Sequence, residues 1–319
     1  MNLANANLGE QKKISLDDVQ DLKFLERRES INFDTISACI QDYSPCSCEV
    51  GVDSIIVVCV NTSVIEIQNV FKSTNDLQIF AFYMETTSPT TSYVLPLDFL
   101  ANKRVLNIAL LSEVFTFPRP SLIIDPLAFR FTRRNTVSFR MENWDLKSQS
   151  DFNFLNEFEV LEELYIHRSV NINGFQSLPD LPALTALYIL SCPSLTDIPF
   201  PDLTPARLKL LVVASSHLDD QATSNILISV GASSSANSIE HIDFNDNGIT
   251  NIPRQFRSFS KLNVLNLSRN KILTIPQYSL IFTTTPVISI DLSYNGVASI
   301  ESGAFEGSLF SLTNAAVLA

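Results

Sequence analysis

Three stretches near the end of the chain carry one pattern of apolar residues and asparagines: Ile239-Glu-His-Ile242-Asp-Phe244-Asn-Asp-Asn247-Gly-Ile249, Leu262-Asn-Val-Leu265-Asn-Leu267-Ser-Arg-Asn270-Lys-Ile272 and Val287-Ile-Ser-Ile290-Asp-Leu292-Ser-Tyr-Asn295-Gly-Val297. The copies follow one another at a nearly constant spacing. Apolar residues occupy positions 1, 4, 6 and 11, and asparagine occupies position 9. Positions 4 and 6 alternate as a short strand with one buried face requires. Such a strand cannot bury its apolar face alone, so we expect the copies to stack side by side.

This spacing is the L-x-x-L-x-L-x-x-N-x-L signature of leucine-rich repeats. It predicts an α/β solenoid: a leucine-rich repeat horseshoe with a parallel sheet on its concave face. The asparagines Asn247, Asn270 and Asn295 are expected to point inward. Because a buried amide must be hydrogen-bonded, they should bind backbone groups where the chain turns.

The same register continues, more weakly, towards the N-terminus. Earlier copies begin at Leu77, Val105, Thr136, Leu161, Leu184 and Leu208. Ser169 and Cys192 stand at the asparagine position in two of them. The two longest units begin at Val105 and Leu208 and should carry extra loop, for which the serine-rich stretch Ser229–Ser238 is a candidate.

The chain therefore divides into three parts. Residues 1–36 form a polar leader, expected to be partly disordered or helical. Within it, Ser15–Glu29 can form one amphipathic helix with Val19, Leu22 and Leu25 on one face. Residues 37–76 form a cysteine-rich N-terminal cap, and residues 77–319 hold about nine repeats and a truncated last strand.

Four cysteines, Cys39, Cys46, Cys48 and Cys59, lie close together in the cap. The Cys-x-Cys spacing fits structural zinc sites poorly, since these prefer two to four intervening residues. Two disulfides that cover the exposed end of the core are the better interpretation, with three possible pairings. They imply an oxidising compartment. Cys192 is expected to be a buried free thiol.

Composition favours a secreted protein that binds other proteins. The net charge of −12 disfavours nucleic acid and anionic membrane surfaces, and suits a partner with a basic rim. The sequence has no apolar stretch of about 18–20 residues that could span a bilayer. Two sequons predict glycosylation at Asn61 and Asn266, in agreement with an extracellular location.

The sequence carries no sign of catalysis. The three histidines, His167, His217 and His241, have no partner at metal-ligand spacing. Phosphate-binding glycine loops, dinucleotide fingerprints and nucleophile elbows are also missing from the sequence. We therefore expect no catalytic residues, cofactor or metal.

Positions 2, 3, 5, 7 and 8 of each repeat should face the concave surface and bind a protein partner. Tyrosine and arginine are favoured anchors because they bury area and keep a polar group. The alternative is that these side chains are simply solvated. The candidates are Tyr165, His167, Arg168, Tyr188, Glu240, Asp243, Asn245, Arg269, Asp291 and Tyr294.

Residues 39–319 also resemble a family of crustacean secreted proteins, the non-catalytic leucine-rich subunits of Oplophorus-luciferin 2-monooxygenase. The resemblance is carried by Cys46-Ser-Cys48, by Val57-Val-Cys59-Val-Asn-Thr, and by Ile67-Gln-Asn-Val70-Phe71 leading into Leu77. It implies a secreted accessory subunit that binds and stabilises a separate, small catalytic chain. Other leucine-rich N-terminal caps imply the pairing Cys39–Cys48 and Cys46–Cys59. An alternative is the ectodomain of a receptor or matrix protein that recognises an extracellular ligand, and a third is an enzyme in its own right.

Overall fold

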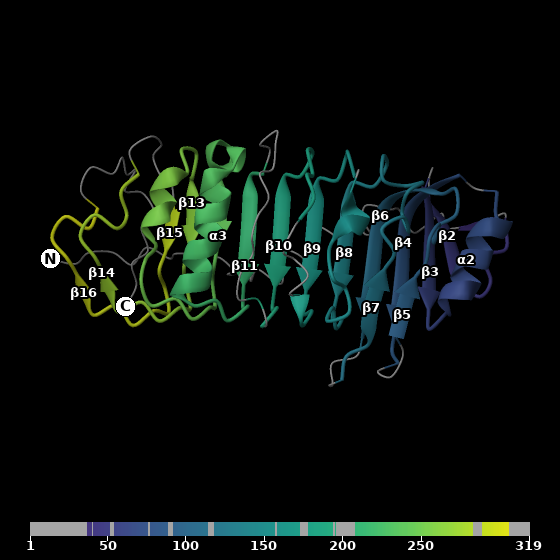
Figure 1. Cartoon of the computed structure of the whole chain (residues 1–319), viewed down its shortest axis with the longest axis horizontal. Helices are drawn as coiled ribbons and strands as arrows, with labels where there is room; N and C mark the ends of the chain where they lie inside the picture. Colours follow the sequence, from purple (N-terminus) through teal and green to yellow (C-terminus); the bar gives the residue numbers. More distant parts are fainter. Residues whose placement is uncertain are drawn as a thin grey trace, which may run out of the picture.

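The computed structural model describes residues 37–39, 41–51, 54–75, 77–88, 92–113, 118–156, 158–172, 178–193, 195, 208–282 and 289–305. The predictions for the leader, residues 1–36, and for the truncated last strand lie outside these residues. Figure 1 shows the described chain as a long row of strands that follows the sequence from one end to the other.

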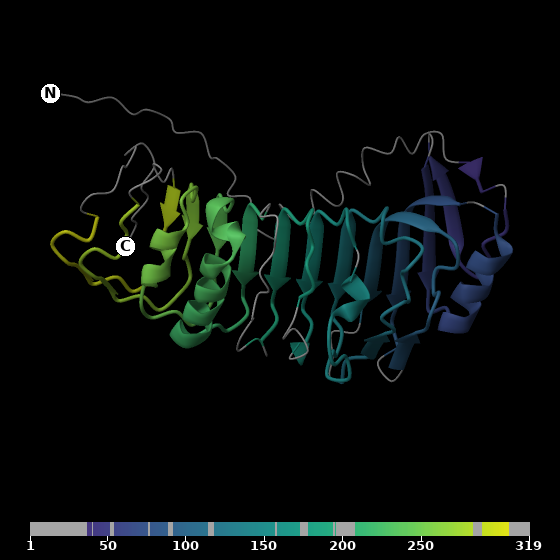
Figure 2. The ribbon, with the colours of Figure 1, turned by 45° about the horizontal axis from the view of Figure 1, so that its top comes forward.

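One large, mostly parallel sheet dominates the structure, which confirms the predicted sheet. Its twelve strands are β1 (Ser37–Ala38), β2 (Ser47–Gly51), β3 (Ser54–Val60), β4 (Gln78–Thr86), β6 (Arg104–Ser112), β8 (Ser138–Glu142), β9 (Glu163–His167), β10 (Ala186–Leu190), β11 (Leu210–Ala214), β12 (His241–Asp243), β13 (Val264–Asn266) and β15 (Ser289–Asp291). They are hydrogen-bonded in that order (Figure 2). The β1–β2 and β2–β3 pairs are antiparallel, and every pair from β3 onward is parallel.

Two small parallel sheets accompany the large one. They pair β5 (Ser92–Leu95) with β7 (Ser121–Ile124), and β14 (Thr274–Ile275) with β16 (Ser299–Ile300). Strand β7 belongs to the first of the two long units, which begins at Val105, and it matches β5 in the unit before. Residues 114–117 of this unit lie outside the described residues, so the extra loop expected there stays a prediction.

Helices are few. The α-helices of the described chain are α2 (Val64–Ser73) and α3 (Asp220–Ala232), and its 3-10 helices are η2 (Asn153–Leu155), η4 (Ser234–Asn237) and η5 (Arg254–Ser258). A capping box between Ser63 and Glu66 begins α2, and the Asp219 carboxylate accepts from the Ala222 N–H at 2.8 Å to begin α3.

The predicted loop at Ser229–Ser238 is also wrong. Its first residues end α3 and its later ones form η4. The reason is tertiary packing: α3 buries Ile226, Leu227 and Val230, and this burial outweighs the weak helix propensity of the serines and glycine.

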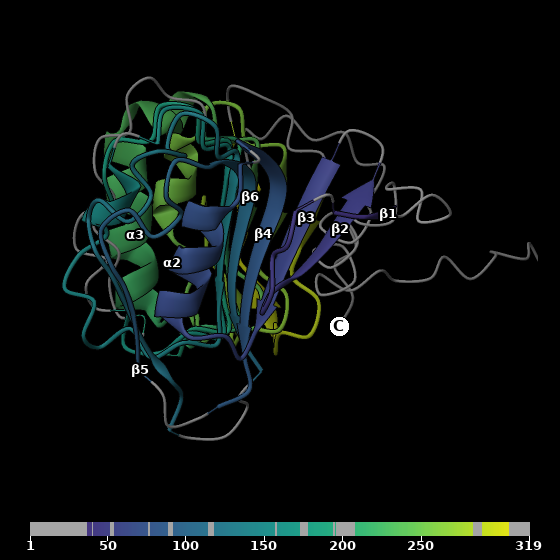
Figure 3. The same ribbon diagram turned by 90° about the vertical axis from the view of Figure 1, so that its right-hand side faces the viewer.

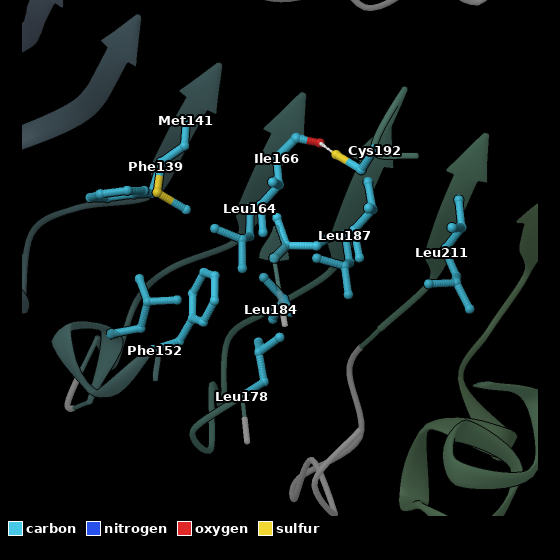
Figure 4. Packing of buried hydrophobic residues seen from close by; sticks show 14 of the residues in the cluster. Phe139, Met141, Phe152, Leu164, Ile166, Leu178, Leu184, Leu187, Cys192 and Leu211 are labelled. Atoms are coloured by element: carbon cyan, nitrogen blue, oxygen red, sulfur yellow. Dashed lines mark hydrogen bonds between the residues drawn. The ribbon is translucent and has the colours of Figure 1, made fainter. Parts of the chain in front are cut away.

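The core lies between the sheet and the helices. Alternate side chains of each strand enter it, and the parallel register aligns them in rows such as Phe139, Leu164, Leu187 and Leu211. Figure 4 shows these residues pointing to the same side of the sheet. Viewed along the row of strands, α2 and α3 lie on that side and β1 on the other (Figure 3).

The three asparagines of the motif are buried or half-buried and fully hydrogen-bonded, as predicted. The Asn270 amide donates to the carbonyls of Phe244 and Leu267 at 2.9 and 3.0 Å, and its oxygen accepts from the Ile249 N–H at 3.1 Å. Asn247 and Asn295 make equivalent bonds. Each asparagine thus ties one strand unit to the unit before it.

The residue before this asparagine position is left-handed in every unit from Thr136 onward. The φ angles lie between 48° and 64° at Asn143, Arg168, Ser191, Ser215, Asp246, Arg269 and Tyr294. The N–H groups of six of these residues donate to the neighbouring unit, for example Ser191 to the Ala214 carbonyl at 2.9 Å. The backbone therefore turns at the same place after each of these strands.

Two disulfides close the N-terminal cap. They join Cys39 to Cys48 and Cys46 to Cys59, the pairs that other leucine-rich N-terminal caps imply. Cys192 is a buried free cysteine, as predicted, and its thiol donates to the Ile166 carbonyl (Figure 4).

Candidate functional site

The face of the large sheet that points away from the core is called the open face here. Side chains of β8 to β15 form one row across its middle, aligned by the strand register. Along the chain this row reads Arg140, Tyr165, Tyr188, Val212, Asp243, Asn266 and Asp291. The character of the row changes from basic to apolar to acidic.

A charged cluster centred on Glu142 occupies the β8–β9 end. Its carboxylate accepts from Arg140 Nη2 at 2.7 Å and from His167 Nδ1 at 3.1 Å, and Arg168 Nη1 lies 3.7 Å away. Burial alone would raise the pKa of Glu142, but the His167 hydrogen bond and the Arg140 charge outweigh it and lower the pKa from 4.5 to about 2. The cluster is therefore a fixed ionic site in which Glu142 is ionised at neutral pH.

An apolar patch follows on β9, β10 and β11. It consists of Tyr165, Ala186, Tyr188, Leu190, Val212 and Ala214. The rings of Tyr165 and Tyr188 are stacked, with centroids 4.2 Å apart and planes 4° from parallel. Burial raises the pKa of both phenols, so both stay protonated at neutral pH.

On β12, β13 and β15 the side chains of the row end in carboxylates and amides. Asp243 is buried, and its carboxylate accepts from the Asn245 side chain at 2.7 Å and the Asn266 side chain at 2.9 Å. Burial raises the pKa of Asp243 and lowers that of the neighbouring His241. Asp243 is thus held by amides and not aimed at solvent, which weakens it as a partner-binding residue.

The far end of the open face is more exposed. The Arg269 guanidinium lies 4.4 Å from the ring centroid of Tyr294, a cation–π pair in which both residues are exposed. Asp291 is half-buried and accepts from the Ser293 N–H at 2.8 Å, while Glu240 lies 3.7 Å from Lys209. These side chains can reach a partner without rearrangement.

The two sequons differ in their surroundings. Asn61 is exposed in the turn after β3 and bonds to Thr87, beside a groove that includes Ser63, Tyr93 and Val94. Asn266 is half-buried, and its amide nitrogen donates to Asp243. Both glycan-accepting nitrogens thus donate a hydrogen bond, and the sequons differ in exposure: Asn61 is exposed and Asn266 is half-buried on the open face.

Reactive chemistry is sparse in the described part of the chain. These residues contain no group of three or more histidines, cysteines or acids that could hold a metal ion. Burial raises the pKa of the Cys192 thiol to about 12, so it is not a nucleophile at neutral pH. Within the same ranges, no helix has the length and hydropathy needed to cross a bilayer.

The structure brings four of the predicted face residues close to one another: His167 and Arg168 around Glu142, and Tyr165 against Tyr188. Sequence reasoning missed Arg140 and Glu142, which carry this charged end. The signal was present: in the copy that begins at Thr136, Phe139 and Met141 occupy the inward positions 4 and 6, so strand alternation places Arg140 and Glu142 on the opposite face.

No protein-family model matches the chain, and no curated protein is similar to it at a significant level.

Proposed function

We propose that this chain is a secreted leucine-rich repeat solenoid whose open face binds another protein. Support for the solenoid comes from the repeated unit itself. Each unit from Thr136 onward contributes one strand and a left-handed residue at one fixed position, and in the three motif copies an inward asparagine bonds to the unit before. This is the nearest-neighbour construction by which repeat proteins build long binding surfaces.

The observation that carries the binding function is the organisation of the open face. A stacked tyrosine pair lies between a charged cluster on Arg140 and Glu142 and an acidic end that includes Asp291. Aromatic and arginine side chains are enriched where proteins bind each other, and flanking charges fix the orientation of a partner. A partner with basic side chains would suit the acidic end.

By resemblance, the partner would be a small catalytic chain that this protein stabilises, as in the non-catalytic subunits of Oplophorus-luciferin 2-monooxygenase. The two disulfides and the exposed sequon at Asn61 agree with an extracellular location. The charged and aromatic residues of the open face are then contact residues, and the chain itself carries out no reaction.

The test is affinity capture from the extracellular fluid of the source tissue with the full chain immobilised. Arg168→Glu and Tyr294→Ala change side chains that are exposed or nearly so on the open face. Each should weaken retention of a specific partner at least about tenfold, the loss of one interface anchor. Arg254→Glu, in η5 on the helix side, is the matched control and should retain the partner. Equal retention by all variants would place the binding surface elsewhere.

A further inference from the structure

The small sheet of β5 and β7 has two edges, and the structure closes one of them. At the edge of β7, the Leu122 N–H donates to the Asp145 carbonyl at 3.2 Å. Further along the same edge, the buried side chain of Gln149 accepts from the Ile124 N–H at 2.7 Å and donates to the Ile124 carbonyl at 3.5 Å. A backbone segment and a glutamine amide thus occupy the place of a neighbouring strand.

The other edge, on β5, is open. The Leu95 carbonyl accepts from the N–H of Asp125, directly after β7, at 2.9 Å. Because backbone groups alternate in direction along a strand, Tyr93 also bonds towards β7, whereas the N–H and C=O groups of Ser92 and Val94 point away from it. Within the described residues, these groups of Ser92 and Val94 have no hydrogen-bond partner, and they are called the β5 edge here.

A groove of about 680 Å³ lies between the β5 edge and the first turn of α2. Apolar side chains are exposed on both of its walls: Ile65 on α2 is 71% exposed and Val94 on β5 is 52% exposed. Gln68 of α2 donates to the Leu97 carbonyl at 3.0 Å, which ties the helix to the chain just after β5. Both elements lie on the helix side of the large sheet, away from the open face (Figure 3).

We propose that the β5 edge binds an extended peptide segment of another protein, which adds to the small sheet as a third strand. Backbone groups of the segment would bond to the N–H and C=O groups of Ser92 and Val94, as in other cases of strand addition. An unpaired edge beside exposed apolar side chains is the kind of surface to which an added strand binds. This site is separate from the open face, so its occupancy does not depend on the proposed function.

The side chains around the groove define the chemistry of the segment. Apolar side chains at every second position would contact Ile65 and Val94. Glu66 is the charged residue among those that line the groove, and it is exposed. Hydrogen bonds from the Ser63 side chain and backbone lower the pKa of Glu66, so its carboxylate is ionised at neutral pH. Basic side chains between the apolar ones would complement this carboxylate and the net charge of −12.

The probe for the test is a synthetic peptide of alternating valine and lysine, about six residues long, which spans about 20 Å when extended. Its binding to the full secreted chain is measured by fluorescence anisotropy at pH 7 and about 0.15 M salt. Asn61 lines the groove, so N-linked glycans are first trimmed to a single sugar. An analogue methylated on every backbone nitrogen carries the same charge and should bind at least about tenfold more weakly, because it lacks the N–H donors.

Two substitutions at one position separate strand addition from charge attraction. Val94→Pro removes the outward N–H without removing a bond to β7, which an edge strand tolerates, and it should weaken binding at least about tenfold. Val94→Thr is the matched control, because threonine keeps the branched shape and the N–H, and its affinity should stay within about threefold of the unaltered chain. On the opposite wall, Ile65→Lys introduces a positive charge and should weaken binding at least about fivefold.

Amide hydrogen exchange on the unaltered chain gives a second measurement, which stands even if Val94→Pro does not fold. With residue-level mass spectrometry, the Val94 N–H should exchange at least about tenfold faster than the N–H groups of Tyr93 and Leu95, which bond to β7. A saturating concentration of the probe should slow the Val94 N–H to the rate of its neighbours and leave theirs unchanged.

Equal binding of the probe and its methylated analogue, or no binding at all, would overturn the proposal. So would a Val94→Pro chain that binds the probe as tightly as Val94→Thr, or a Val94 N–H that exchanges as slowly as its neighbours in the absence of the probe. Association of the chain with itself that Val94→Pro abolishes would replace the peptide by a second copy of this chain. A failure of the open face to retain a partner leaves all of these results unaffected.

Discussion

Replacing Glu142 by glutamine tests the electrostatics of the charged cluster. In the wild-type protein the pKa of Glu142 falls from 4.5 to about 2, which corresponds to about 3 kcal/mol of unfolding free energy at about 1.4 kcal/mol per pKa unit. The side chain is 17% exposed, so solvent screens these contacts only weakly. At pH 7, Glu142→Gln should therefore lower the unfolding free energy by about 3 kcal/mol, because Arg140 and Arg168 lose their counter-charge.

The pH dependence gives the sharper result. Since the folded pKa is depressed, the contribution of Glu142 is complete above the unfolded value of 4.5 and is lost as the pH falls from about 4.5 to about 2. Urea unfolding followed by circular dichroism at pH 7, 5, 4 and 3 measures this. The wild-type curve should fall towards that of Glu142→Gln across the window, so that the two converge at low pH.

Glu240→Gln is the control. Glu240 lies 3.7 Å from Lys209, with side chains 44% and 61% exposed, and an exposed pair of this kind contributes less than about 1 kcal/mol. Parallel stability–pH curves for the wild type and Glu142→Gln, offset by a constant amount, would refute the electrostatic explanation and leave only a packing effect.

Further predictions concern the cap, the left-handed turns and the sequons. Replacing Cys46 and Cys59 together by alanine should cost about 3 kcal/mol of stability in thermal unfolding, because their bond closes a loop with a sequence separation of 13. Ser191→Gly should raise the unfolding free energy by up to about 1 kcal/mol, while Ser191→Val should lower it by about 1–2 kcal/mol, since φ is 53° there. In secretory expression, mass spectrometry should find a glycan on Asn61 but not on Asn266, because Asn61 is exposed whereas Asn266 is half-buried and its amide nitrogen donates to the buried Asp243.

Each of these has a clear contrary result. An alanine pair with unchanged thermal stability would show that the cap does not depend on the Cys46–Cys59 bond. Ser150→Gly, at an exposed position that is not left-handed, should reduce stability slightly, and an equal gain there would contradict the explanation for Ser191. A folded, secreted chain with a glycan on Asn266 would contradict the third prediction.

The repeated motif predicted the sheet well because its positions are set by local geometry. The alternation of apolar residues requires the side chains of Leu164, Leu187 and Leu265 to point into the core. It also buries the Asn270 amide, which must then hydrogen-bond to the backbone. Composition is a poor guide at Ser229–Ser238, where burial of Val230 decides the structure and serine content does not. The helix at Val64–Ser73 was not predicted, although Ser63 and Glu66 have the spacing of a capping box.

The candidate site was predicted less completely. Alternation placed Tyr165 and Tyr188 on the open face, but their stacking depends on the register between strands, which the sequence alone left uncertain. Asp243 was expected to be available to a partner, and instead amides from two strands hold it. Hydrogen bonds between units, such as that from Asn266 to Asp243, join residues far apart in the sequence, so no local pattern reveals them.

From β8 onward, each strand of the large sheet is followed by a left-handed residue at the same position of its unit. Because the chain turns at this fixed place, units of different length differ on the helix side. The segment between Tyr188 and Val212 is shorter than the segment between Val212 and Asp243, yet both pairs are direct neighbours across adjacent strands. Segments added or removed between units can therefore change the back of the molecule while every side chain at the front keeps its distance from the next. Grafting a new loop onto the helix side should leave recognition at the front intact.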